Sequence, residues 1–263
     1  MRKYFCGEYY KCQSATQTLA LIPARHGDTR SVQLICDDGA WSVSEKLAGN
    51  RFSREGIELN IASEGLTAAG SVRFGELTPI DGDIMGVFKY VPFMQCRHSV
   101  ISMRHTVCGD IVINGKHYVF DDALGYIEGD RGYSFPKKYV WTQSFFDEGS
   151  LMLSVADIPF AGFGFTGVIA VVMLRGREYR LATYLGAKAE KTGDGGLVIR
   201  QGDFTLSARL IEKKALPLLA PVRGSMVRTI HESASCRAAY SFYKGKAALL
   251  EFETDRASFE AEY

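Results

Sequence analysis

Long hydrophobic runs are scarce in this sequence of 263 residues. A membrane-spanning helix needs about 18 or more consecutive apolar residues. The nearest candidate, FGFTGVIAVVML at residues 163–174, is shorter, rich in β-branched residues and bounded by glycines. The first residues, MRKYFCGEYYKCQ, are basic but have no apolar stretch of the kind that marks a secretory signal. We therefore expect a cytoplasmic protein, for which peripheral contact with a membrane stays open.

Paired cysteines and metal-binding motifs are also missing. The six cysteines are scattered, without a C-x-x-C pair or a Cys/His cluster at zinc spacing, which predicts reduced thiols and no metal site. There is no G-x-S-x-G elbow, no H-E-x-x-H, no P-loop and no dinucleotide-binding fingerprint. We therefore expect no cofactor, and any chemistry would come from ordinary side chains.

Excess charge of either sign is absent as well. The formal net charge is +1, and charged residues make up 23% of the chain. Binding to a polyanion depends on an excess of basic residues. Nucleic acid is therefore not an expected partner.

Aromatic residues and glycine, in contrast, are abundant. Phenylalanine, tyrosine and tryptophan make up 12% of the residues, and the chain has 27 glycines but only 7 prolines, which is typical of β-sheet with tight turns. Strand–turn–strand patterns recur at residues 31–45 and 168–186, and Asn114-Gly115 between alternating apolar residues predicts a two-residue hairpin. Helical periodicity is nearly missing. The pattern predicts an all-β fold of short antiparallel strands.

The sequence also contains a weak internal repeat. Three segments recur in the same order, and the matches pair Gln13 with Gln143, Pro23 with Pro159, Gly56 with Gly196 and Cys96 with Cys236. Such self-similarity indicates duplication of one structural unit. We therefore expect two lipocalin-like antiparallel β-barrels or sandwiches, one from residues 1–125 and one from residues 126–263.

The first candidate site is the segment GYIEGDRGYSFPKKYVW at residues 125–141. If its beginning is extended, Tyr126, Glu128 and Asp130 share one face, because side chains alternate along a strand. Two carboxyl groups held close together in an aromatic setting can supply a neutral acid. Two solvated acids on an edge strand or turn would give the same spacing.

Two histidines form the second candidate, His98 and His105 in QCRHSVISMRHTVCGD. Their separation of seven is odd, so a regular strand points them to opposite faces, and only a bulge would bring them together. A shared metal site is therefore not expected, and each histidine is either a hydrogen-bonded structural residue or a proton carrier. In the repeat, His98 corresponds to Ala238 of the other half, so the repeated pattern itself does not require a histidine at this position.

A third candidate follows in KKYVWTQSF, where Tyr139, Trp141 and Gln143 alternate onto one face. Large rings beside one amide could line an apolar pocket with a single polar anchor. The same alternation of Tyr139, Trp141 and Gln143 is also expected if these residues only pack in the core of a β-barrel.

The order of these motifs resembles the tocopherol cyclase family. The resemblance spans at least residues 75–187, and its most specific part is the string G-Y-I-E-x-D-x-G, then S-F-P, then W-x-Q. It implies a pair of lipocalin-like β-barrels, in agreement with the repeat. Gly129 and Arg131 stand where the plant pattern, IEKDWG, has a basic residue and an aromatic one.

The resemblance implies an isomerase that closes a ring on a prenylated quinol or a similar lipophilic substrate. A proton would be delivered to an alkene while a phenol loses its own proton. The implied roles are Glu128 or Asp130 as the acid, His98 as the base or phenol anchor, Tyr126 and Trp141 beside the cation, Gln143 orienting the ring, and His105 as a further substrate contact. A non-catalytic lipocalin-like binder of a hydrophobic ligand and an isoprenoid hydratase are the alternatives.

Overall fold

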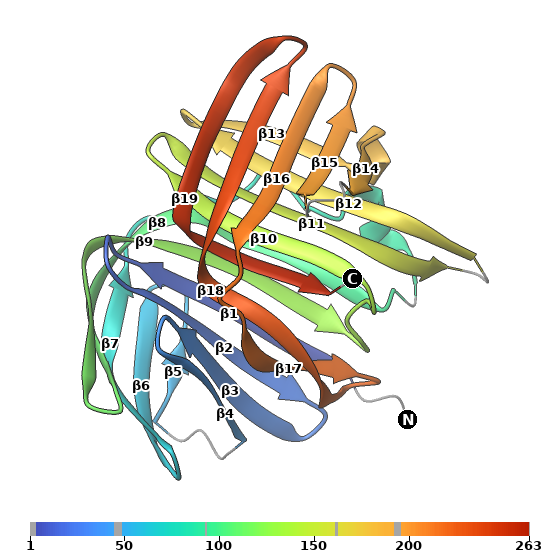
Figure 1. The fold of residues 1–263 in the computed structure, drawn as a ribbon. Helices are drawn as coiled ribbons and strands as arrows, with labels where there is room; N and C mark the ends of the chain where they lie inside the picture. The colour runs from blue at the N-terminus through green and yellow to red at the C-terminus, as the bar shows by residue number, and fades with distance from the viewer. Residues whose placement is uncertain (1–3, 45–48, 93, 161–162, 192–195, 263) are drawn as a thin grey trace. The chain divides into compact units, whose positions relative to one another are not determined.

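The computed structural model describes residues 4–44, 49–92, 94–160, 163–191 and 196–262 (Figure 1). Within these ranges the chain forms β-strands and two short 3₁₀ helices, η1 (Gly86–Tyr90) and η2 (Thr183–Leu185), but no α-helix. The strands make one sheet of nine strands and one of ten. The expectation of an all-β fold with two lipocalin-like antiparallel sheets is confirmed.

The first sheet has the strand order β4-β3-β2-β1-β9-β8-β7-β6-β5. Of its central strands β1, β9 and β8, β9 carries the predicted acidic residues and β8 carries the predicted histidines. The bounds are β1 (Phe5–Gln13), β2 (Thr18–His26), β3 (Thr29–Cys36), β4 (Gly39–Ser44), β5 (Arg51–Phe52), β6 (Gly56–Ser63), β7 (Leu66–Phe74), β8 (Cys96–Ile113) and β9 (Lys116–Gly132).

The second sheet repeats this arrangement, with the order β13-β12-β11-β10-β19-β18-β16-β15-β14 and β17 paired to β18 off this path. Its bounds are β10 (Tyr139–Phe146), β11 (Gly149–Phe160), β12 (Phe163–Leu174), β13 (Arg177–Ala182), β14 (Lys188–Lys191), β15 (Gly196–Gln201), β16 (Phe204–Glu212), β17 (Leu216–Val222), β18 (Ser225–Lys244) and β19 (Ala247–Glu262).

Equivalent strands of the two sheets carry the repeated residues found in the sequence. Gln13 and Gln143 lie on the matching strands β1 and β10, and Gly56 and Gly196 lie on β6 and β15. The prolines of the repeat likewise lie on β2 and β11. The repeat in the sequence therefore corresponds to a repeat of strand order.

The match between Cys96 and Cys236 is different. Both lie on equivalent strands, β8 and β18, but Cys96 contacts Asp130 whereas Cys236 packs in the second hydrophobic core together with Ala238. The two cysteines are therefore not at matching positions. The expected equivalence of His98 and Ala238 is wrong, because these residues point to different faces of their sheets.

The chain folds into two compact units that are not contiguous in sequence. The first unit contains residues 1–83, 93–135 and 216–229, and the second contains residues 84–92, 136–215 and 230–263. Segment 84–92, which includes η1, thus belongs to the second unit, and β17 belongs to the first. The division at 125/126 lies inside β9, and it stays a prediction about the repeat in the sequence.

Each unit has its own apolar core. Tyr10, Cys12 and Ile127 belong to the core cluster of the first unit, while Tyr9 and Lys11, which alternate with them on β1, are also buried. The same holds for β10 in the second unit, where every residue from Tyr139 to Phe145 is buried. The central strands therefore have two buried faces, of which one is the apolar core.

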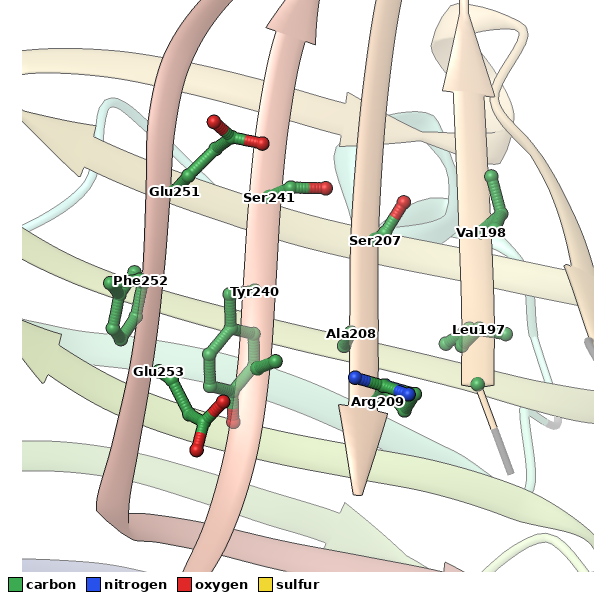
Figure 2. A pocket seen from close by; sticks show the side chains of 12 residues that line it. Leu197, Val198, Ser207, Ala208, Arg209, Tyr240, Ser241, Glu251, Phe252 and Glu253 are labelled. Carbon is green, nitrogen blue, oxygen red and sulfur yellow. The ribbon is translucent and has the colours of Figure 1, made fainter. Parts of the chain in front are cut away.

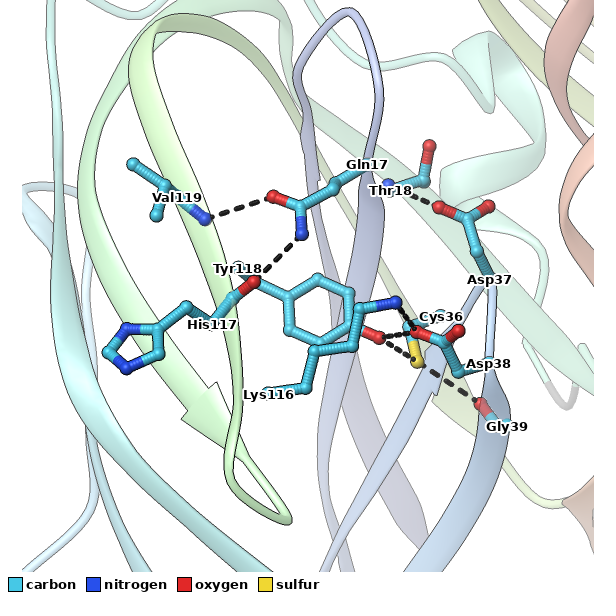
Figure 3. Close-up of polar contacts among 10 residues, drawn as sticks. All are labelled: Gln17, Thr18, Cys36, Asp37, Asp38, Gly39, Lys116, His117, Tyr118 and Val119. Carbon is cyan, nitrogen blue, oxygen red and sulfur yellow. Dashed lines mark hydrogen bonds and ion pairs between the residues drawn. The ribbon is translucent and has the colours of Figure 1, made fainter.

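The predicted hairpins are present. Asn114 and Gly115 have φ angles of 47° and 83°, the positive values that a two-residue turn of this kind requires. Beside this turn, Lys116 donates to Asp38 (2.6 Å), and the buried Tyr118 hydroxyl donates to both Asp38 and Cys36 (Figure 3). These contacts join the β8–β9 turn to the β3–β4 turn within the first unit.

The residues described by the structure include no helix with the length and apolar character needed to cross a bilayer.

Candidate acid–base site

The site begins on β9, where the extended backbone separates the side chains into two rows. Ile127 points into the core of the first unit. Because side chains alternate along a strand, Tyr126, Glu128 and Asp130 point to the opposite face. Tyr126 and Glu128 are only 0% and 5% exposed, so this face is closed to water at these two residues.

β8 brings His98 to the same face. In the antiparallel pairing of β8 with β9, His98 lies directly opposite Asp130, and Val100 lies opposite Glu128. Directly opposed residues project on the same side of a sheet. The imidazole therefore reaches both carboxyl groups: Nδ1 is 3.1 Å from Oδ1 of Asp130, and Nε2 is 3.3 Å from Oε2 of Glu128.

Two further side chains contact the outer ends of this group. The Tyr126 hydroxyl donates to Oε2 of Glu128 at 2.5 Å, and the Cys96 thiol donates to Oδ1 of Asp130 at 3.2 Å. The five residues make a continuous chain of polar contacts, Tyr126–Glu128–His98–Asp130–Cys96, which we call the acid–base chain. Its His98–Glu128 link is an ion pair in which Nε2 lacks hydrogen-bond geometry. The side chains of His98 and Glu128 are 10% and 7% exposed, whereas that of Asp130 is 24% exposed.

The surroundings set the charge of His98. Burial alone would lower its pKa, but the charges of Glu128 and Asp130 and their hydrogen bonds outweigh burial and hold the pKa well above the ordinary value of 6.5. His98 is therefore an imidazolium at neutral pH. Burial and the nearby Glu128 raise the pKa of Tyr126, and burial and the nearby Asp130 raise that of Cys96, so both stay protonated hydrogen-bond donors.

The same residues include a nitrogen and carboxyl oxygens that lie within 4.8 Å of one another, close enough to consider a metal ion. The geometry is unfavourable for one. A metal binds a single nitrogen of an imidazole, and the lone pairs of the two ring nitrogens diverge. Here the carboxyl groups contact different ring nitrogens, so their oxygens do not converge on one ligand position. The arrangement is better suited to sharing protons.

His105 lies apart from this chain. Its Nδ1 is 3.0 Å from the Ser102 hydroxyl, and its ring packs edge-on against Phe74 on the core side of β8. Burial lowers the pKa of His105 to about 4, so its ring is neutral. The structure therefore brings Tyr126, Glu128 and Asp130 together with His98 but not with His105.

Trp141 and Gln143 belong to β10 of the second unit. Both are buried, and they alternate with Val140, which belongs to the core of that unit. Trp141 lies opposite Glu260 in the pairing of β10 with β19. Their predicted contact with a substrate stays a prediction.

A groove of about 550 Å³ crosses β15, β16, β18 and β19 in the second unit (Figure 2). Small residues, among them Gly196 and Ala239, contribute to its lining, and Glu253 at its edge is paired with Arg237. Its lining includes no residue predicted from the sequence to be catalytic or substrate-binding. The groove and the acid–base chain are separate features.

Cys96 is the member of the acid–base chain that sequence reasoning missed. In the sequence, Cys96 was singled out only because the internal repeat pairs it with Cys236. A signal was available, because Cys96 and His98 are two residues apart and would share a face of one strand. Without the partner strand, however, nothing in the sequence connects that face with Asp130.

Comparisons with known proteins support the fold. No protein-family model and no curated protein matches the sequence. Solved structures of the same all-β class do match. Kievitone hydratase from Nectria haematococca has a TM-score of 0.55 at 9% identity, covering 98% of this chain and 88% of that one. An AttH-type protein from Nitrosomonas europaea has a TM-score of 0.52 at 11% identity, covering 100% and 93%. CghA has a TM-score of 0.60 at 10% identity, covering 99% and 88%.

Proposed function

We propose that the protein is an enzyme that adds an O–H group across an isoprenoid double bond, and that its main reaction is the cyclisation of a prenylated quinol, as in the tocopherol cyclase family. The observation that carries this proposal is the buried His98 with a carboxyl group at each ring nitrogen. Buried groups of this kind with strongly shifted pKa values are concentrated at functional sites. The hydratase of the same fold adds support.

The reaction needs one proton donor and one proton acceptor. A carboxylic acid of the acid–base chain donates its proton to one alkene carbon, and the other carbon becomes cationic. The quinol oxygen bonds to that carbon and loses its proton, which returns to the carboxylate. A π bond and an O–H bond break, a C–H bond and a C–O bond form, and the product has the mass of the substrate.

His98 gives the donor its strength in this scheme. An imidazolium beside the carboxyl group stabilises the carboxylate that remains after the proton has left. The remaining carboxyl group in turn keeps His98 charged. General acid–base catalysis of this kind contributes about a 100-fold to 10,000-fold rate enhancement.

The charges of the site also limit the substrate. The carboxylate that forms when the acid gives up its proton favours a transition state with cationic character and would repel an anionic substrate. We therefore propose a neutral lipophilic substrate, such as a prenyl quinol, rather than a prenyl diphosphate.

The proposal is tested by incubating the purified protein with a panel of prenylated hydroquinones and separating the products by chromatography with mass detection. A product of unchanged mass, with one C=C bond and one phenolic O–H group fewer than the substrate, is expected from wild type. His98→Asn should lose about 100-fold or more of this activity. Absence of any product across the panel would contradict the cyclase assignment.

Hydration of an isoprenoid is the second candidate, favoured by the fold shared with kievitone hydratase. The same panel distinguishes it, since the product then gains the mass of one water. Recovery of a bound hydrophobic molecule that neither reacts nor depends on His98 would instead indicate a non-catalytic lipocalin-like binder.

A further inference from the structure

The two carboxyl groups of the acid–base chain differ in their remaining contacts. Oε2 of Glu128 accepts the Tyr126 hydroxyl and also faces His98. Oδ1 of Asp130 contacts both His98 and Cys96. Among the residues that the structure describes, the second oxygen of Asp130, Oδ2, has no hydrogen-bond partner.

The two carboxyl groups also differ in exposure, and Asp130 is the more exposed of the two. The Asp130 side chain is 24% exposed, compared with 7% for Glu128. A carboxyl oxygen that reacts must be within reach of the substrate. By this measure Asp130 is the more accessible of the two carboxyl groups, and Oδ2 is its oxygen without a hydrogen-bond partner among the described residues.

Resting on the proposed function, we propose that Asp130, through Oδ2, is the carboxyl group that exchanges a proton with the substrate, and that Tyr126 and Cys96 are positioning residues. In the reactive form Asp130 carries a proton on Oδ2, and Glu128 alone supplies the negative charge beside His98. Asp130 donates this proton to the alkene carbon, and the quinol proton returns to Oδ2 after the C–O bond has formed. His98 keeps its own protons throughout and stabilises the carboxylate form of Asp130 through Oδ1.

The positioning roles follow from which oxygens are occupied. The Cys96 thiol and Nδ1 of His98 both contact Oδ1, which leaves Oδ2 as the oxygen that neither of them occupies. The Tyr126 hydroxyl fixes the carboxyl group of Glu128 at the opposite ring nitrogen. Removing either donor leaves the charges unchanged but removes one of the contacts that orient a carboxyl group.

Carbodiimide activation followed by coupling to an amine tests the assignment without any need for turnover. Peptide mapping by mass spectrometry should find Asp130 modified and Glu128 unmodified in the folded protein. Modification of Glu128 with protection of Asp130 would overturn the proposal. If the quinol panel yields no product while Asp130 is still selectively modified, the proposed reaction fails but the accessible carboxyl group stands.

Turnover provides the second test. Asp130→Asn should lower kcat about 100-fold or more with little change in KM, whereas Glu128→Gln keeps measurable turnover with an altered pH profile. Tyr126→Phe and Cys96→Ala should each lower kcat about tenfold, and Cys96→Ser should restore part of it. Wild-type kcat in Asp130→Asn would refute the catalytic role.

Matched controls separate positioning from general destabilisation. Tyr118→Phe removes another buried hydroxyl that is bonded to a carboxylate in the same unit (Figure 3), and Cys12→Ala removes another buried thiol. Neither should change the pH profile of kcat. Equal effects of Tyr126→Phe and Tyr118→Phe on that profile would show that Tyr126 has no positioning role.

Discussion

Glu128→Gln is the most direct test of the electrostatics of the acid–base chain. The substitution keeps the shape of the side chain and an oxygen that can accept the Tyr126 hydroxyl, but it removes the charge that faces Nε2 of His98 at 3.3 Å. Both side chains are about nine-tenths buried, so water screens this interaction little. Removing one partner of a buried ion pair costs about 3–5 kcal/mol. Because Asp130 stays as a second partner of His98, we expect a smaller loss of about 2 kcal/mol of unfolding free energy near neutral pH.

The direction of the His98 pKa shift determines how the stability difference between wild type and Glu128→Gln changes with pH. The pKa of His98 is raised in the folded state, mainly by Glu128 and then by Asp130 against the effect of burial. The charged form of His98 therefore stabilises the folded state fully below the pKa of histidine in the unfolded chain, about 6.5. This stabilisation is lost as the pH rises through the pKa of His98 in the folded protein. Glu128→Gln lowers the folded pKa, so the advantage of wild type should be largest near pH 6 and should shrink in the alkaline range.

Urea unfolding monitored by tryptophan fluorescence measures this difference. In a Trp141→Phe background, Trp41 reports on the first unit, which contains the site. Glu148→Gln is a matched control, because Glu148 pairs with Arg175 at the surface, where water screens the ion pair and its loss changes stability little. A wild-type advantage over Glu128→Gln that does not change with pH would refute the assigned charge of His98.

Three further outcomes follow from the first unit. The ring of His105 should keep a constant NMR shift between about pH 5.5 and 8, because burial has lowered its pKa to about 4. Gly125→Ala should lower the urea midpoint and cost about 1–3 kcal/mol, because the new methyl group would lie 2.2 Å from Nε2 of His105. Tyr118→Phe should cost about 1 kcal/mol in the same assay, since the hydroxyl loses Asp38 and Cys36 as acceptors.

The strands and turns of this protein were predictable because they depend on local rules. Period-two alternation places Tyr126, Glu128 and Asp130 on one face, and it needs only an extended backbone. The Asn114-Gly115 turn is specified by its need for positive φ angles. Both features can be recognised within a few residues of sequence.

The partner of the two carboxyl groups was not predictable in the same way. The turn pairs Ile113 with Lys116, and an uninterrupted hairpin from this start would place His98 opposite Arg131. Register shifts within β8 move His98 opposite Asp130 instead. A shift of one residue reverses the face of a side chain. The site therefore depends on bulges, for which the sequence has no clear local signal.

The division into units was unpredictable for a different reason. Segment 84–92 lies in the first half of the chain but belongs to the second unit. Strand β17 lies in the second half of the chain but belongs to the first unit. In β17, the backbone of Leu219 both donates to and accepts from the side chain of Gln33 in the first unit. Such long-range placements depend on tertiary packing, which neither composition nor periodicity specifies.

The two faces of the central strands explain how one fold can hold both a stable core and reactive polar groups. On β9, Ile127 packs in the apolar core, while Glu128 beside it faces His98. A substitution at Glu128 therefore opens no cavity in the core, and its cost is limited to the electrostatic contacts of the other face. The residues of that face can then diverge while the strand order persists, in keeping with identities of only 9–11% to structures that match almost the whole chain.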